Sequence, residues 1–570
     1  MTIGQLGNST EVVPHQGQVT VIELGHDLLT LLDDGLVEGV GLFAAALGHL
    51  DDDLAAVGLA PNPLDQSLPR QPIDQRCRCG GSETGGGGEL AGSLRSVGQP
   101  VQTAQVRWSQ PEPPSDRIIE GLNAALVPLH CQADLTQQCL TEVGHRDTFR
   151  ISKYMILVRE DSKMRALIVG GGIAGPAAAI ALSRVGIDPV VLERRGAADA
   201  AAGSYFTLAP NGLDALRALG LLDLARAAGF PSKTNIMYGA TGRKLGEVSL
   251  GQPIEDGLTA LTMKRSRLSA RLIEEAERRG IAVYRGAPVA TVSDCGHAPG
   301  VIGGGVVATL RDGTRYTGDL LIGTDGVHSL VRRTIDPKAP GGRYVGLTNF
   351  GGVTRSTPIA AELQPEAWHF VFGEAAFFGA HPTPGGDVVW FVNVPEPEIS
   401  SEQRRSTGLV QWQRRLAGLL ANDAGPAADL VRAGTLELAG DNTYDLPHVP
   451  TWTRGSMAVI GDAAHAPSPS SGQGASLALE DAVVLAQAVR DTASRPDRVP
   501  AAFAAYERAR RARVERIVAA GARSSSAKIP GRIGRRLQET VLRLVFTFAV
   551  TEEKTAWMNG HRIEWNAKVA

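Results

Sequence analysis

Cysteine is scarce in this chain of 570 residues: five are present, and four of them precede Met164. The chain after Met164 therefore holds one thiol, Cys295, which excludes a scaffold of internal disulfides there. The sequence also lacks a basic N-terminal segment followed by an apolar core. No uninterrupted apolar stretch reaches the roughly 18 residues that a membrane span needs. These absences favour a cytoplasmic protein without stable membrane insertion.

Neither sign of charge dominates, since the net charge is −3 and 43% of the residues are hydrophobic. This balance gives no reason to expect nucleic acid as a partner, and the length allows two or more packed units. The charge is unevenly spread, however. Residues 1–163 hold 21 acidic and 11 basic side chains, a net charge of −10, whereas the rest of the chain has a net charge of +7.

The first 163 residues also differ in composition from the remainder. Lysine and tyrosine are absent before Lys153 and Tyr154, and the stretches "GGSETGGGG" and "WSQPEPPSDR" resist regular structure. Met164 is a plausible initiator, so we expect residues 1–163 to be poorly ordered or not normally translated. A genuine interaction domain is the alternative, which only the acidic bias supports.

Several metal-ligating residue types occur in this extension, at Cys77, Cys79, His130, Cys131, Cys139 and His145. Zinc sites favour pairs of cysteines separated by two residues, and these cysteines lack that spacing. We therefore predict no metal site.

A glycine-rich turn between two short strands follows Met164. The strand "RALIVG" leads into Gly170-x-Gly172-x-x-Gly175, the apolar segment "PAAAIALSRVG" and a second strand, "DPVVLE". This is a βαβ unit with a dinucleotide-binding fingerprint. Gly170 permits the tight turn, Gly172 lets a pyrophosphate approach the backbone, and Gly175 lets the helix pack closely. Glu193 ends the second strand, where its carboxylate can accept the ribose hydroxyls of an adenosine.

Two later segments repeat this design. Asp325-Gly326 follows the buried strand "DLLIG", at the end where α/β sheets bind ligands. Asp462 follows the strand "MAVIG", where it would reach a polyol hydroxyl. The loop around Gly472 and Gly474 then opens a long helix, whose first amides would face negative charge.

These motifs resemble the FAD-dependent aromatic hydroxylases, the group A flavoprotein monooxygenases of the para-hydroxybenzoate hydroxylase type, over about residues 164–570. Three motifs match in order and spacing: Gly170 to Gly175 with Glu193, Asp325-Gly326 with Ser329 and Arg332, and Gly461-Asp462 with His465 and Pro467. The family's R-x-x-L-x-x-x-L is matched at Arg265, Leu268 and Leu272, where the arginine resembles a residue near the flavin ribityl and phosphate groups. Ser476 departs from the family, which often has Asn there.

The resemblance implies FAD as the cofactor and NAD(P)H as a transient co-substrate. A flavin C4a-hydroperoxide formed with O2 would hydroxylate a phenolic, polyketide-like or other electron-rich small molecule. Two alternatives stay open: a flavin dehydrogenase or reductase without oxygen insertion, and a non-catalytic FAD-binding protein that sequesters a ligand. The implied cofactor-binding residues are Gly170, Gly172, Ile173, Ala174, Gly175, Glu193, Arg194, Arg265, Asp325, Gly326, Asp462, Gly472, Gly474 and Ala475.

We expect an α/β fold in which a Rossmann-like FAD-binding domain is interleaved with a β-sheet substrate domain and followed by C-terminal helices. The predicted ranges are 164–340 and 441–500 for the FAD-binding domain, 341–440 for the substrate sheet and 501–570 for the helical region. The basic side of the helix after residue 499 is expected to face solvent. The segment "LQETVLRLVFTFAV" would pack as a helix or mediate dimerisation, with membrane association as the weaker option. The protein is expected to be a monomer or a homodimer.

The substrate is expected to meet the flavin on strands such as "AWHFVFG" and "DVVWFVN", which alternate large side chains. Candidates for the pocket wall are Trp368, Phe370, Phe378, His381 and Trp390, with core packing as the alternative for each. No residue identifies itself as a catalytic base, and His381 is the sole candidate that we name.

Overall fold

The computed structural model describes residues 163–196, 203–254, 257–296, 305–493, 495–526, 543 and 552–569, all of which belong to one of the chain's two compact units. The predictions for residues 1–162, including their cysteines and histidines, lie outside the described residues. The same holds for the segment "LQETVLRLVFTFAV", apart from Arg543.

A six-stranded sheet carries the glycine-rich turn, with the strand order β18-β19-β12-β1-β2-β8. All neighbours in it pair in parallel except β18 and β19. The apolar runs of β1 and β2 are buried on both faces, as expected of a parallel sheet covered on two sides. The bounds are β1 Arg165–Val169, β2 Asp188–Glu193, β8 Ala282–Arg285, β12 Leu320–Gly323, β18 Thr453–Arg454 and β19 Met457–Val459.

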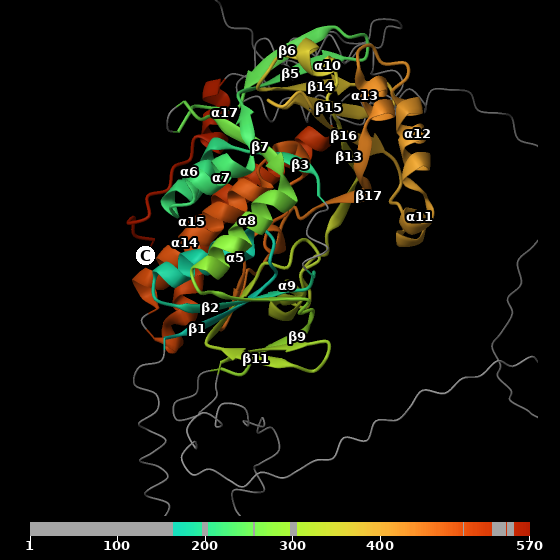
Figure 1. Ribbon diagram of the computed structural model, residues 1–570. Helices are drawn as coiled ribbons and strands as arrows, with labels where there is room; N and C mark the ends of the chain where they lie inside the picture. Colours follow the sequence, from blue (N-terminus) through green and yellow to red (C-terminus); the bar gives the residue numbers. More distant parts are fainter. Residues whose placement is uncertain are drawn as a thin grey trace, which may run out of the picture. The chain divides into compact units, whose positions relative to one another are not determined.

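Helices and a small antiparallel sheet cover the two faces of this six-stranded sheet (Figure 1). On one face lie α5 Ala174–Arg184, α8 Arg265–Arg278, α14 Gly474–Thr492 and α15 Val499–Ser526. On the other lies the sheet β11-β10-β9, with bounds β9 Val289–Asp294, β10 Val306–Leu310 and β11 Arg315–Gly318. The predicted α/β fold with a Rossmann-like unit is confirmed.

A separate seven-stranded sheet has the order β17-β13-β16-β15-β14-β5-β6. Five of its strands are β13 Arg343–Thr354, β14 Ala367–Phe372, β15 Phe377–Pro382, β16 Val388–Pro395 and β17 Thr435–Asp445. The other two, β5 Thr234–Gly239 and β6 Lys244–Ser249, come from outside the range 341–440 in which the sequence predicted this sheet. The parallel pairing of β5 with β14 joins distant segments, and no local turn signals such a pairing.

The two faces of the seven-stranded sheet have different neighbours. One packs on α12 Leu409–Leu419 and α13 Ala427–Ala433 around a buried apolar core. The other meets a three-stranded sheet of order β3-β7-β4, with bounds β3 Tyr205–Leu208, β4 Phe230–Ser232 and β7 Ala260–Lys264. The remaining elements are α6 Pro210–Ala218, α7 Leu222–Ala228, α9 Leu330–Ile335, α10 Ile359–Glu362, α11 Ser401–Ser406, η2 Gly461–Ala463, η3 Pro469–Ser471, η4 Pro496–Arg498 and α17 Glu552–Asn559.

The basic helix α15 is more deeply buried than its sequence indicates. Arg508 is exposed as expected, but Arg510 is only 1% exposed, so the expectation of a solvated basic face is wrong at this position. The reason is that acidic side chains of α14 face Arg510 inside the protein. No helix in the described parts of the chain combines the length and hydrophobicity required to cross a membrane.

Candidate cofactor and substrate site

The three glycines of the fingerprint serve two different purposes. Gly170 has a φ of +114°, and a Cβ at Gly175 would lie 1.9 Å from the Gly170 carbonyl oxygen, so the protein's own packing requires both glycines. A Cβ at Gly172, by contrast, would meet no described atom within 4 Å. The open space beside Gly172 adjoins the N-terminus of α5, where backbone amides favour a phosphate group. This geometry fits a dinucleotide.

Glu193 lies beside this glycine loop. One of its carboxylate oxygens accepts the amide hydrogen of Gly171, and the other accepts that of Arg195 at 2.7 Å. The backbone therefore holds the carboxylate at the end of β2, as a ribose-binding residue requires. Ile173 is buried at the start of α5, and the side chain of Arg194 is exposed.

Two further predicted residues meet although 197 positions separate them. Arg265, the first residue of α8, forms an ion pair of 3.3 Å with Asp462 in η2, and their side chains are 59% and 30% exposed. In the same helix, Ser269 donates hydrogen bonds of 3.0 and 3.2 Å to the carbonyls of Gly171 and Gly172. The start of α8 thus borders both the glycine loop and the Gly461-Asp462 loop.

Asp325 has a structural role that its sequence motif does not indicate. Its carboxylate accepts the Ser329 hydroxyl at 2.5 Å and the backbone amides of Leu330 and Val331 at 2.7 and 3.2 Å. Burial raises the pKa of Asp325, while these hydrogen bonds favour its charged form. The carboxylate therefore stabilises the start of α9, and Gly326 follows it with a φ of +81°.

Arg332 links α9 to the Gly461-Asp462 loop. It is fully buried, and its guanidinium donates to the carbonyls of Ala463 at 2.9 Å and Val327 at 2.6 Å. Two motifs that lie more than a hundred residues apart in the sequence are thereby held together.

The loop before α14 has open space beside its backbone and buried polar side-chain atoms near it that lack a hydrogen-bond partner. A Cβ at Gly472, whose φ is +62°, would meet no described atom within 4 Å, and Gly474 and Ala475 begin the helix. The Ser476 hydroxyl and the Asn211 amide oxygen are buried and have no hydrogen-bond partner among the described residues. Open backbone and unpaired polar atoms at a helix N-terminus fit the polar edge of a bound cofactor.

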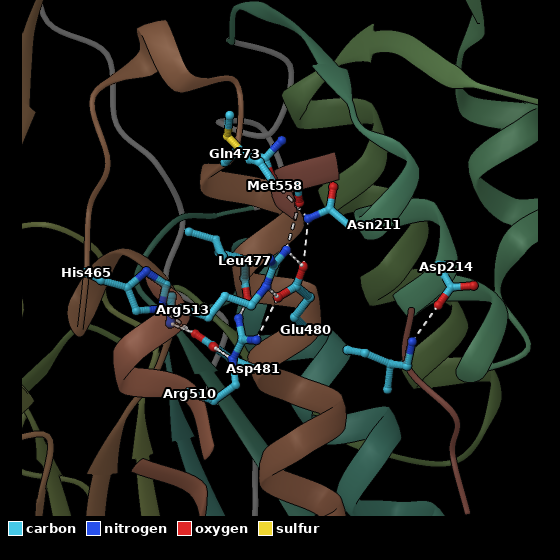
Figure 2. A network of polar contacts seen from close by, with 12 residues as sticks. Asn211, Asp214, His465, Gln473, Leu477, Glu480, Asp481, Arg510, Arg513 and Met558 are labelled. Carbon is cyan, nitrogen blue, oxygen red and sulfur yellow. Dashed lines mark hydrogen bonds and ion pairs between the residues drawn. The ribbon is translucent and has the colours of Figure 1, made fainter. Parts of the chain in front are cut away.

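A buried ionic cluster lies directly behind this loop (Figure 2). Asp481 of α14 accepts the Gly461 amide at 2.9 Å, His465 Nε2 at 2.5 Å and Arg510 Nε at 2.7 Å. Burial acts to raise the pKa of Asp481, but its interactions with His465 and Arg510 outweigh the burial and hold the pKa far below its usual value. Asp481 therefore stays charged and fixes the Gly461-Asp462 loop.

Glu480 forms the other half of the ionic cluster. It pairs with Arg510 Nη1 at 2.6 Å and with Arg513 Nη2 at 2.9 Å, and it accepts the Asn211 amide at 2.6 Å. Burial opposes its ionisation, yet the two arginines lower its pKa to about 2. Two adjacent acids inside the apolar helix "GASLALEDAVVLAQAV" are the signal that could have predicted this cluster, because buried charges need partners.

A second buried polar network, without net charge, joins the three-stranded and seven-stranded sheets. His381 Nδ1 lies 2.8 Å from the Pro382 carbonyl, which can only accept, so Nδ1 carries the hydrogen. Burial lowers the pKa of His381 to about 4, so the ring is neutral and Nε2 accepts the Ser232 hydroxyl at 2.9 Å. Both ring nitrogens are therefore engaged, and neither is free to act as a base toward a substrate.

Further hydrogen bonds connect Ser232 to the indole ring of Trp368, and the direction of each follows from the one before it. Ser232 accepts from Thr262 at 2.7 Å, and Thr262 accepts from Thr207 at 2.8 Å. Trp368 Nε1 then donates to Thr207 at 2.7 Å and to Thr262 at 3.1 Å. The hydroxyl chain, which we define as Thr207, Ser232, Thr262, Trp368 and His381, fixes the indole ring against the sheet.

The predicted pocket residues divide between the two faces of the seven-stranded sheet. Trp368 and Phe370 stack with their ring centroids 5.7 Å apart on the face toward the three-stranded sheet, where His381 also lies. Phe378 and Trp390 instead belong to the core under α12 and α13. Residues of adjacent positions on a strand point to opposite faces, and the sequence alone did not reveal which face was covered.

The βαβ unit and the open glycine loop define a dinucleotide-binding protein. Residues 163–521 match the family model described as FAD binding domain, and the chain belongs to this family. Its relatives identify the class as the group A flavoprotein monooxygenases, which confirms the resemblance found from the sequence motifs.

Individual relatives are similar over most of their own length. Aurachin C monooxygenase/isomerase of Stigmatella aurantiaca is 30% identical over 363 residues, which cover 62% of this chain and 87% of that protein. FAD-dependent urate hydroxylase of Mycolicibacterium vanbaalenii is 32% identical over 363 residues, which cover 62% and 86%. The crystal structure of Klebsiella pneumoniae HpxO with FAD and uric acid has a TM-score of 0.56 at 26% identity and covers 67% of this chain and 92% of that one.

The protein is an FAD-dependent monooxygenase. FAD as the cofactor is confirmed, and NAD(P)H as the electron donor is consistent with the family. Neither a flavin dehydrogenase without oxygen insertion nor a ligand-sequestering FAD protein is favoured by these relatives.

Proposed function

We propose that this monooxygenase hydroxylates an uncharged aromatic small molecule that lies against Phe370 and Phe391, the partly exposed rings that pack on buried Trp368. The observation that carries this proposal is the neutral aromatic face of the seven-stranded sheet. Trp368, Phe370 and Phe391 lie with their ring centroids 5.5 to 6.0 Å apart, and the polar groups behind Trp368 are the uncharged hydroxyl chain. Such a surface favours a flat apolar ring over an anion.

The cofactor would be held by the residues that the sequence motifs indicate. The N-terminal amides of α5 beside Gly172 would bind the pyrophosphate, and Glu193 would accept the ribose hydroxyls. Arg265 and Asp462 would bind the phosphate and polyol between them. When bound, FAD supplies electron transfer from NAD(P)H to O2 and the delivery of one oxygen atom to the substrate.

The chain's own residues prepare the other end of the cofactor site. The first amides of α14, at Gly474 and Ala475, would stabilise negative charge through the helix dipole. An ion pair of 3.1 Å between Lys264, next to Arg265, and Glu437 of β17 joins the cofactor side to the substrate sheet. We therefore propose that the substrate lies near this junction, where aromatic side chains would exclude water.

Three further predictions remain proposals. We propose action in the cytoplasm, which the need for NAD(P)H supports, and a monomer or homodimer. We also retain the FAD-binding ranges 164–340 and 441–500, the substrate sheet at 341–440 and the helices at 501–570, with residues 234–249 contributing two strands to the substrate sheet.

The test is oxygen incorporation by the purified holoprotein. NAD(P)H oxidation, O2 uptake and transfer of ¹⁸O from ¹⁸O2 would be measured with a panel of neutral phenols and quinolones and with urate as the anionic comparison. We expect labelled product with a neutral ring and substrate-dependent NAD(P)H oxidation. Product from urate but from none of the neutral rings would refute the proposed substrate class.

A variant of the aromatic face sharpens this test. Phe370→Ala removes half of the stacked pair, so we expect a KM roughly tenfold higher, because a lost aromatic contact costs on the order of 1.5 kcal/mol. Phe378→Leu, on the opposite face, should leave KM unchanged. An equal rise in KM for both variants would contradict the assignment of the substrate to the Trp368 face.

A further inference from the structure

The C-terminal residues 552–569, here called the C-terminal strap, are fastened to the helices of the FAD-binding unit. Arg513 donates to the carbonyls of Trp557 and Met558, each at 2.8 Å. Asp214 accepts the Ile563 amide at 2.7 Å (Figure 2). Further contacts of the strap include those of Gln487 with the carbonyls of Glu564 and Trp565, of Arg490 with the carbonyls of Trp565 and Ala567, and of Arg184 with the Trp565 ring at 3.9 Å. The strap lies beyond the residues that match the family model.

One contact of the C-terminal strap reaches the loop before α14. Gln473 Nε2 donates to Asn559 Oδ1 at 2.8 Å, and Gln473 is only 2% exposed. Gln473 stands between Gly472 and Gly474, the two glycines proposed to face the cofactor. A residue of the strap therefore holds the side chain in the middle of this loop.

The donor order of this contact is fixed by Glu480. The carboxylate is charged and can only accept, so the Asn211 group that contacts it at 2.6 Å must be the NH2 group. The same Asn211 NH2 group donates to Gln473 Oε1 at 2.9 Å, which leaves Gln473 Nε2 to donate to Asn559. Asn559 Nδ2 then donates to the Leu250 carbonyl at 3.4 Å. Each amide has one orientation that satisfies its neighbours.

We propose that Asn559 is a positioning residue for the cofactor, acting through Gln473 on the loop before α14. With both ends of its amide engaged, Gln473 holds the backbone of Gly472 and Gly474 in the conformation that presents the first amides of α14. Loss of the Asn559 contact frees the Gln473 side chain and loosens this loop, while Glu480 and Arg510 keep the helix itself in place. This inference rests on the proposed contact between the α14 loop and FAD.

The test uses the full-length holoprotein and the variant Asn559→Ala. The release of FAD on dilution would be followed by its fluorescence, and the environment of the bound flavin by visible circular dichroism. We expect FAD to be released roughly fivefold faster, as is typical of coupling between two sites, with a changed flavin dichroism spectrum. The matched control is Asn566→Ala, an exposed asparagine of the same strap, which should behave as the wild type.

Two more variants keep the proposal falsifiable. Asn559→Asp retains an oxygen that accepts from Gln473 Nε2, so it should restore most of the slow release. In a Gln473→Ala background, Asn559→Ala should cause no further acceleration, because its effect acts through Gln473. The proposal is overturned if Asn559→Ala matches Asn566→Ala, or if its effect persists undiminished in the Gln473→Ala background. All of these readouts are taken without substrate, so a failure of the proposed hydroxylation would leave them unchanged.

Discussion

The protein contains two buried polar networks, one charged and one neutral, in which buried polar groups find partners in different ways. In the ionic cluster of Glu480, Asp481, Arg510 and Arg513, full charges are buried and each carboxylate receives more than one cationic or amide donor. In the hydroxyl chain that ends at His381, no group is charged, and each hydroxyl donates a hydrogen bond to the next oxygen or nitrogen. Both networks meet the requirement that buried polar groups find partners.

The difference appears in the pKa values. Surrounding arginines hold the pKa of Glu480 at about 2, so the carboxylate remains charged at every physiological pH. Burial without a charged partner lowers the pKa of His381 to about 4, so the imidazole remains neutral. The ionic cluster lies behind the proposed flavin loop, and the neutral chain lies behind the aromatic face. The placement of charge therefore matches what each region is proposed to bind.

Arg510→Leu would break the ionic cluster and should have the largest effect. Because Glu480 and Asp481 would both lose a partner while remaining buried, we expect the free energy of unfolding to fall by about 3–5 kcal/mol. Urea denaturation of the holoprotein, followed by circular dichroism, measures this loss.

The control for this variant is Arg508→Leu on the exposed side of α15. We expect a change within about 0.5 kcal/mol, as for other surface substitutions. Similar losses for Arg508→Leu and Arg510→Leu would show that the buried pairing is not what stabilises this helix.

The hydroxyl chain, through His381, predicts a pH dependence of the free energy of unfolding that the ionic cluster does not share. The folded pKa of His381, about 4, lies below its ordinary value of 6.5, so the unfolded state binds more protons between these two values. The stability that this neutral ring contributes is complete above pH 6.5 and is lost as the pH falls toward 4. Between pH 8 and pH 5 the loss should be about 2 kcal/mol.

The measurement compares the wild type with His381→Gln by urea unfolding at both pH values. The glutamine retains an acceptor for Ser232 but does not titrate, so the fall in stability between pH 8 and pH 5 should be about 2 kcal/mol smaller in the variant. Glu480 does not contribute to this window, because its stabilising effect is lost only below its ordinary pKa of 4.5. The same fall in both proteins would contradict the neutral buried ring.

The contrast between the two networks also explains what could be predicted from sequence. The glycine turn and the Glu193 position follow from local residue patterns, and the structure contains the predicted βαβ unit. Arg265 and Asp462 were each identified by motif, but their ion pair depends on tertiary structure. Glu480 and Asp481 carry a visible signal, since two acids interrupt an apolar helix.

The neutral hydroxyl chain has no such signal. Its serine and threonine residues come from three separate strands, and each is an ordinary strand residue when taken alone. Only the packing of one sheet on another brings them to Trp368 and His381. The division of Trp368 and Trp390 between opposite faces was also hidden, because period-two alternation does not indicate which face an unseen neighbour covers.

The smallest effect is expected from a single break inside the hydroxyl chain. Thr262→Val removes the acceptor of the Thr207 hydroxyl and should lower the free energy of unfolding by about 1–2 kcal/mol, the usual cost of an unsatisfied buried donor. Ser232→Ala should cost a similar amount, because Thr262 then loses its own acceptor. Since the two hydroxyls bond to each other, the double variant should cost about 1 kcal/mol less than the sum of the single variants. Urea denaturation of the wild type, the two single variants and the double variant measures these four free energies of unfolding. Strictly additive losses would mean that the two hydroxyls stabilise the sheet interface independently and do not form a chain.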